Sequence, residues 1–293
     1  MSVQSNPLGG SARRRRSAWR FFKRHALTVY ALLAVGYLML PIAVVILFSF
    51  NAPKGRFNYV WQGFTLDNWI NWNSILGIQD AVITSIQVGL LATVIATVLG
   101  TLIALAIVRH QFRGRSSTNM LVFLPMATPE IVLGASLLTL FLNVLPIRIG
   151  GLEFGQLGFW TIFIAHVMFI VSFIVVTVKA RLIGFDRHLE EAAMDLGANE
   201  ITTFRKVTLP LIAPAMLAAA LLGFAISIDD FVITYLNAGS TQTFPVFVWG
   251  AARVSVPPQV NVVASAIFLI AIALALGNVF WQYRSAKRTQ GAT

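Results

Sequence analysis

The sequence has no cysteine among its 293 residues. This absence excludes disulfides, thiolate metal sites and a cysteine nucleophile. Charge is also scarce, because only 11% of the residues are Asp, Glu, Lys or Arg, whereas 57% are hydrophobic and the mean hydropathy is +0.77. Soluble domains carry roughly 25% charged residues, so this composition indicates an integral membrane protein.

Enzyme motifs are missing as well. The sequence has no G-x-x-x-x-G-K-[ST] phosphate loop and no H-E-x-x-H metal motif, and the segment from Gly134 to Leu138 lacks the closing glycine of a nucleophile elbow. The histidines are far apart in the sequence. We therefore expect no enzymatic activity and no metal site. We interpret His166, which lies inside an apolar run, as a packed and hydrogen-bonded helix contact.

Long apolar runs dominate what is present. A helix needs about 20 apolar residues to cross about 30 Å of hydrocarbon. The runs that are long enough are 26–48, 82–107, 120–144, 160–178, 211–235 and 260–282. They predict an all-α fold with six transmembrane helices. The predicted organisation is a basic disordered tail at 1–25, one membrane domain at 26–283 and a short tail at 284–293.

The basic residues are distributed unevenly between alternate connections. Of the 22 Lys and Arg residues, 18 lie in the two tails and in the connections near 109–115 and 179–210, and 4 lie in the other connections. Because positive charge stays on the cytoplasmic side, the sequence predicts a multi-pass protein of the cell (plasma or inner) membrane with both termini cytoplasmic. The net charge of +11 is thus a topology signal, with Arg13–Arg16 near anionic lipid, and no nucleic-acid partner is expected.

The most charged stretch is EEAAMDLGANEITTFRKVTLP, which begins at Glu190 and is predicted to be cytoplasmic. Asp186 suits the N-cap of a helix over about 187–196, and Gly197 suits the left-handed position after it. This helix has an apolar face, which consists of Leu189, Ala192, Ala193 and Leu196. Because so short a helix is unstable alone, we expect the face to dock, either on its own bundle or lipid, or on a cytoplasmic partner.

A second short helix is predicted to begin after Asn199 and to end at Pro210. The spacing of Glu-Ala-Ala at 191–193, Gly197 and Val-Thr-Leu-Pro at 207–210 resembles the EAA loop of permease subunits of binding-protein-dependent ABC importers, with valine where that family usually has isoleucine. The resemblance implies that the first helix couples to an ATPase. The residues implied are Glu190, Glu191, Ala192, Ala193, Leu196 and Gly197.

Three further stretches extend the resemblance: PMATPEIVLGASLLTLF from Pro125, AHVMF from Ala165 and SIDDFVITYL from Ser227. They are similar to the putrescine/spermidine branch of the family, whereas residues 1–20 are not. The resemblance implies an ABC type-1 permease fold. It also implies four kinds of partner: a second permease subunit, ATP-binding cassette ATPase subunits, an extracytoplasmic substrate-binding protein and a polyamine substrate. ATP is then bound by the ATPase subunits, and no cofactor is expected in this chain.

Acidic residues inside the apolar runs are candidates for the substrate pathway. Glu130 lies in the third run, and Asp229 and Asp230 lie in the fifth. A carboxylate in hydrocarbon is costly unless it is paired or faces water, so we interpret these acids as contacts for a cation. Glu130 is expected near the midplane, about 15 Å deep at 1.5 Å per residue, and Pro129 permits a kink there. Adjacent residues point about 100° apart on a helix, so one aspartate is alternatively structural, capping a broken helix or binding a backbone amide.

The residues leave the substrate open. A carboxylate-lined path suits a polyamine, but an amino acid, sulfate, ferric ion or opine are alternatives. A secondary carrier is a further alternative, disfavoured because the sequence has no internal repeat. The aromatic stretch at 57–75 is interpreted as an interfacial belt with Trp61, Trp69 and Trp72 at headgroup level. The alternative is a platform for the binding protein.

Overall fold

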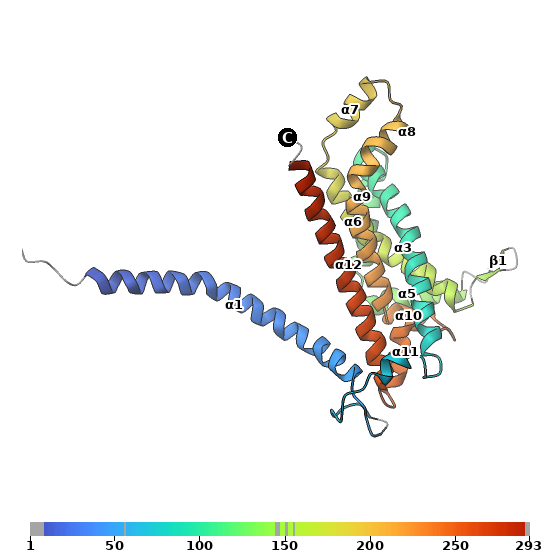
Figure 1. Ribbon diagram of the computed structural model, residues 1–293. Helices are drawn as coiled ribbons and strands as arrows, with labels where there is room; N and C mark the ends of the chain where they lie inside the picture. Colours follow the sequence, from blue (N-terminus) through green and yellow to red (C-terminus); the bar gives the residue numbers. More distant parts are fainter. Residues whose placement is uncertain (1–8, 56, 144–146, 150–151, 155, 291–293) are drawn as a thin grey trace, which may run out of the picture. The chain divides into compact units, whose positions relative to one another are not determined.

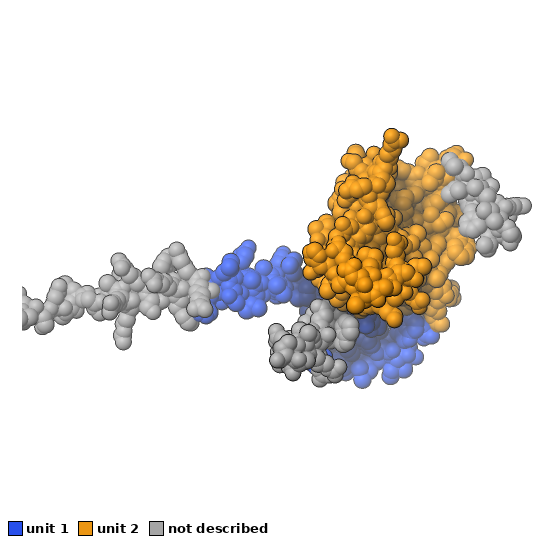
Figure 2. Space-filling view, turned by 90° about the horizontal axis from the view of Figure 1, so that it is seen from above, with its two compact units in different colours: residues 1–74, 255–293 blue, residues 75–254 orange. Residues whose placement is uncertain are grey.

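The computed structural model shows a helical chain with one short β-hairpin (Figure 1). It describes residues 9–55, 57–143, 147–149, 152–154 and 156–290. The chain divides into two compact units, drawn in different colours in Figure 2. Unit 1 comprises 1–74 and 255–293, and unit 2 comprises 75–254. Each unit is described by itself.

Unit 1 contains the first and last helices of the chain. Its elements are α1 (Gly9–Ser49), α2 (Asp67–Ile70) and α12 (Pro258–Gln290). Unit 2 contains the helices between them and the hairpin. Its elements are α3 (Ile78–Arg109), α4 (Arg115–Ala127), α5 (Glu130–Asn143), β1 (Ile147–Ile149), β2 (Leu152–Phe154), α6 (Phe159–Ile183), α7 (His188–Asp195), α8 (Glu200–Thr203), the π-helical turn η1 (Phe204–Thr208), α9 (Leu209–Asp229), α10 (Val232–Asn237) and α11 (Phe244–Ala252). The two strands pair antiparallel.

Helices α3, α6 and α9 pack against one another at the centre of unit 2 (Figure 1). Small buried residues recur along α3 at one-turn spacing, namely Ala92, Ala96, Gly100 and Ala104. A Cβ atom at Gly100 would lie 2.7 Å from Ile174 Cγ2 of α6, so only glycine permits this close approach. Small residues let backbones approach in a membrane, where packing rather than water exclusion holds helices together. The sequence therefore builds a tight three-helix centre.

Several helices are long and apolar enough to cross a membrane. In the described part of the chain these are His25–Ser49, Ile78–Arg109, Phe159–Ile183 and Glu200–Asp229. A fifth crossing is counted if α4 and α5 together form one span, and the apolar part of α12 found in the described residues, Pro258–Leu274, is shorter. The prediction of a multi-pass helical membrane protein is confirmed. The count of six spans stays a prediction.

The third predicted span is two helices rather than one. Helix α4 ends at Ala127, α5 begins at Glu130, and the two are bent by 109°. Thr128 between them is extended, with φ −81° and ψ 132°, a conformation that the following proline favours. Pro129 itself cannot donate an N–H to a continuing helix. The break exceeds the expected kink, so the depth of Glu130 reckoned along one straight helix does not apply.

The fifth predicted span is also broken. Helix α9 ends at Asp229, and Asp230 is extended, with φ −65° and ψ 122°. The short helix α10 then runs from Val232 to Asn237.

The predicted helix end at Pro210 is wrong. Helix α8 begins after Asn199 as expected, and the Asn199 Oδ1 accepts the Thr202 N–H at 2.8 Å. The chain then continues through η1 into α9 without a stop. In the π turn the Leu209 N–H bonds to the Phe204 carbonyl, five residues earlier, whereas in an α-helix it would bond to the carbonyl four residues earlier. Proline is tolerated in the first turn of a helix, and the wider π turn before it fits the ring into a continuous helix.

The loop after α1 is held by asparagine side chains. Asn51 Nδ2 donates to Asn58 Oδ1 at 2.7 Å, and Asn68 Nδ2 donates to the carbonyls of Ser49 and Asn51 at 3.0 and 2.8 Å. Trp69 Nε1 donates to Ser49 Oγ at 3.1 Å. All three asparagines are buried. This polar core orders the aromatic stretch, whose place at the headgroups stays a prediction.

The two ends of the chain are more helical than expected. Helix α1 begins at Gly9, so the backbone is helical over much of the tail predicted to be disordered at 1–25, and α12 extends to Gln290. Arginine and alanine favour helix, and the segment is continuous with a long apolar helix. Residues 1–8 and 291–293 lie outside the described chain. The predicted domain boundaries stay a prediction.

Candidate functional site

The helices that follow the two breaks pack together. Gly134, one turn into α5, faces α10, where a Cβ atom would lie 2.9 Å from Leu236 Cδ1 and 3.3 Å from the Ile233 Cα. Asn237 Nδ2 donates to the Gly134 carbonyl at 3.2 Å and to the Ile233 carbonyl at 2.9 Å. The glycine and the asparagine thus hold the first turns of α5 against α10.

Glu130 is the first residue of α5. Its side chain is exposed and has no hydrogen-bond or ion-pair partner among the residues that the structure describes. The helix N-terminus gives it a favourable electrostatic position, since the free N–H groups there carry partial positive charge. Glu130 is therefore a carboxylate at a helix N-terminus that pairs with no basic side chain of the described residues.

Asp229 and Asp230 have different surroundings. Asp229, the last residue of α9, is exposed and has no partner in the described part of the chain. Asp230 is 8% exposed, and its Oδ2 accepts the Thr234 N–H at 2.8 Å and the Thr234 hydroxyl at 2.7 Å. Its Oδ1 lies 3.4 Å from the Ile233 N–H. Asp230 thus caps the first turn of α10, which is the structural alternative that the sequence left open for one aspartate.

His166 joins the buried end of this arrangement. Its Nδ1 lies 2.7 Å from Ser227 Oγ of α9, and its Nε2 lies 2.8 Å from Thr234 Oγ1 and 3.3 Å from Asp230 Oδ2. The ring is 2% exposed. The expected hydrogen-bonded helix contact is therefore present, and it links α6 to both sides of the break. Sequence reasoning missed Ser227 and Thr234, although their spacing of about one turn from Asp230 was a usable signal.

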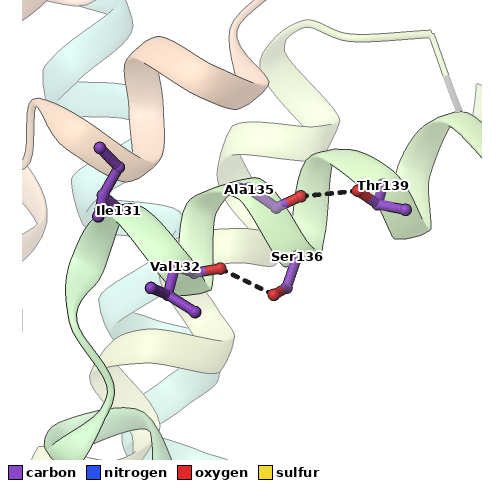
Figure 3. A pocket seen from close by; sticks show the side chains of 5 residues that line it. All are labelled: Ile131, Val132, Ala135, Ser136 and Thr139. Carbon is purple, nitrogen blue, oxygen red and sulfur yellow. Dashed lines mark hydrogen bonds between the residues drawn. The ribbon is translucent and has the colours of Figure 1, made fainter.

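The opposite side of α5 is open. Figure 3 shows a pocket there, lined by Ile131, Val132, Ala135, Ser136 and Thr139. The two hydroxyls donate to carbonyls of their own helix, Ser136 to Val132 at 2.7 Å and Thr139 to Ala135 at 2.9 Å. None of the predicted pathway acids lines this pocket. The pocket is therefore lined by aliphatic side chains and by two hydroxyls that are bonded to their own helix.

The predicted coupling helix is α7. It lies within one residue of the predicted bounds at either end, and Asp186 Oδ1 accepts the His188 N–H at 3.0 Å. Its apolar face is largely uncovered, since Leu189 is 48% exposed and Leu196 is 90% exposed, and Ala192 is exposed as well. Docking of this face on the chain's own bundle is not observed for these residues.

Gly197 ends α7 in the left-handed conformation, with φ +89°. Its N–H bonds to the Met194 carbonyl at 2.8 Å, and the Ala198 N–H bonds to the Ala193 carbonyl at 3.1 Å. These two bonds form a Schellman motif, which favours glycine because a side chain is strained there. The predicted role of Gly197 in the turn is confirmed.

The two glutamates of α7 face different surroundings. Glu191 is exposed and lies 3.2 Å from its neighbour His188 Nδ1. Glu190 Oε1 instead accepts from Arg109 Nη2 at 2.8 Å and from Thr208 Oγ1 at 2.5 Å. Arg109 ends α3, and its guanidinium lies 5.1 Å from the centre of the Phe185 ring. Glu190 therefore bonds to residues of other helices in this chain, whereas the side chain of Glu191 is exposed.

Comparison with known proteins identifies the family. Residues 96–290 match the family described as binding-protein-dependent transport system inner membrane component. The chain belongs to this family. The spermidine/putrescine transport system permease protein PotC of Haemophilus influenzae is 37% identical over 87% of this chain and 94% of its own. The putrescine transport system permease protein PotI of Escherichia coli is 34% identical over 91% of this chain and 90% of its own.

A solved structure supports the fold. A bacterial ABC transporter involved in the import of alginate matches with a TM-score of 0.64 and 18% identity, covering 92% of this chain and 99% of that chain. At this identity the likeness shows the fold alone. The protein is thus a permease subunit of an ABC importer and not an enzyme.

Proposed function

We propose that this permease forms the translocation path for a polyamine, with six spans and both termini in the cytoplasm. The unequal distribution of basic residues, 18 on one side and 4 on the other, supports the orientation. The relatives named for spermidine and putrescine transport support the substrate class. Its partners are a second permease subunit, ATP-binding cassette ATPase subunits, an extracytoplasmic substrate-binding protein and membrane lipid.

The observation that carries the substrate proposal is the pair of free carboxylates at the two helix breaks. Glu130 and Asp229 are exposed and have no partner within the described residues, whereas Asp230 is engaged by Thr234 and His166. A carboxylate without a basic partner attracts a cation whose hydration shell is thinned in the path. Glu130 and Asp229 are thus the contacts for the cation. Asp230, the third acid predicted for the pathway, shapes the path by fixing the start of α10.

The coupling proposal rests on the uncovered face of α7. Leu189, Ala192 and Leu196 are exposed, and a helix this short needs a partner to be stable. The ATPase subunit covers this face, with Glu191 at its edge and Ala193 and Gly197 shaping the contact. ATP is bound by that subunit, and this chain contributes no cofactor site.

The test measures uptake per assembled transporter. In proteoliposomes with the ATPase, the second permease and the binding protein, Glu130→Gln and Asp229→Asn should each slow polyamine uptake on the order of tenfold, which corresponds to about 1.4 kcal/mol of barrier. Binding of the polyamine to its external receptor should be unchanged. Asp80→Asn is the matched control, because Asp80 is an exposed acid in the first turn of a different helix, α3. Uptake per transporter equal to the wild type in both variants would refute the role of these carboxylates.

A further inference from the structure

The contact between Arg109, Glu190 and Thr208 joins three separate elements. Arg109 is the last residue of α3, Glu190 lies in the first turn of α7, and Thr208 ends the π turn before α9. Both donors bond to the same Glu190 oxygen, at 2.8 and 2.5 Å. We refer to these three residues as the Glu190 tether.

The tether is well shielded for a contact at the edge of the helical bundle. The side chains of Arg109 and Glu190 are 12% and 17% exposed, and Thr208 is 3% exposed. The Phe185 ring covers the guanidinium at 5.1 Å. A charge pair shielded in this way is less screened than one in open water, and two donors on one oxygen fix its direction. The tether is thus a rigid link, unlike the exposed Glu191 and His188 pair, which is 60% and 87% exposed.

Most of the other residues of α7 are exposed. The apolar residues Leu189 and Leu196 are exposed, and only Glu190 and Ala193 are partly covered. Of the ion pairs found within the described residues, the one from Glu190 is the only one that connects α7 to a long helix. A movement of α7 can therefore reach α3 through the Glu190–Arg109 pair, and it can reach α9 through the Glu190–Thr208 bond as well as through the packing of α7 on η1.

We propose that Glu190, Arg109 and Thr208 are positioning residues that transmit movement of α7 to α3 and to the π turn before α9. The π turn suits this role, because single π turns inside α-helices are frequent at functional sites. The proposal rests on the proposed coupling function of α7. It assigns Glu190 to transmission within this chain, while the uncovered apolar face serves the external contact.

The test compares transport with ATP hydrolysis in the complete reconstituted transporter. Glu190→Gln should leave the amount of assembled complex near the wild type. Uptake per ATP hydrolysed should fall at least about fivefold, the lower end of typical coupling between sites. The double variant Arg109→Glu with Glu190→Arg should recover part of this loss, since it restores opposite charges. The matched control is Glu200→Gln, because Glu200 is exposed and has no partner within the described residues.

A second pair of variants keeps the test sharp if the charge changes impair folding. Thr208→Val removes one donor and keeps the volume, so it should lower uptake per ATP in the same direction by less, whereas Thr208→Ser keeps the hydroxyl and should behave as the wild type. An unchanged ratio in Glu190→Gln would overturn the proposal. So would a loss confined to the amount of assembled complex, which marks a folding contact only. Absence of ATP-driven uptake in the wild-type complex would instead refute the proposed function.

Discussion

The two broken spans of unit 2 stop by different means. In the third segment the break contains Pro129, preceded by the extended Thr128, and the acid that follows it is exposed. In the fifth segment there is no proline at the break, and the buried Asp230 holds the turn through Thr234 and His166. The first break follows from the backbone restrictions that proline imposes, and the second depends on hydrogen bonds between buried side chains. Within the described residues, the acid at the first break, Glu130, is exposed and has no partner. At the second break, Asp229 is likewise exposed without a partner, whereas Asp230 is buried and holds the turn.

The largest effect is expected from Asp230→Ala. It leaves the Thr234 N–H and the Thr234 hydroxyl without their acceptor in a buried place, at a cost of up to about 3 kcal/mol. The amount of folded protein in the membrane should fall, as measured by size-exclusion chromatography of the solubilised complex. Asp229→Asn is the matched control, since Asp229 is exposed and unpartnered in the described part of the chain. Equal yields of the two variants would mean that the buried network does not hold the fifth break.

A smaller loss is expected from Gly134→Val, which acts on both breaks at once. The Cβ atom would lie 2.9 Å from Leu236 Cδ1 and 3.3 Å from the Ile233 Cα. The leucine end can move, but the α10 backbone must shift, so the cost should be about 1–2 kcal/mol. Thermal unfolding of the purified complex should show a lowered midpoint. Gly36→Val is a suitable control, because nothing lies within 4 Å of its Cβ position, and a midpoint as low as that of Gly134→Val would point to a general effect of valine.

The sequence predicts where the helices and the acids lie along the chain, but it does not predict which residues contact one another in space. Apolar runs are a local signal, so the long helices of the described chain lie close to the predicted ranges. The size of the bend in the third segment does not follow from the sequence, because Pro129 alone predicts only a kink. The expected depth of Glu130 is wrong for the same reason, since it assumes one continuous helix. The choice between Asp229 and Asp230 needed the position of His166, which is distant in the sequence. In the same way, the partner of Glu190 is Arg109 on another helix. Such pairs come from packing, and a single sequence does not show them.

The smallest effect is expected from Pro129→Ala, which asks whether the third break needs its proline. Alanine keeps the backbone carbonyl that accepts the Val132 and Leu133 N–H groups. It adds one N–H at an exposed position, and it frees the unfolded chain at a cost of about 0.4–1 kcal/mol. The packing of Gly134 against α10 remains, so the bend should persist although the backbone no longer enforces it.

Because the chain has no cysteine, spin labels on single cysteines at Leu121 and Leu142, both exposed, can report the separation of α4 and α5. The distance distribution should match that of the labelled protein with Pro129. A shift to the longer distance of a straight helix would show that proline alone makes the break and that α10 has no part in holding α5.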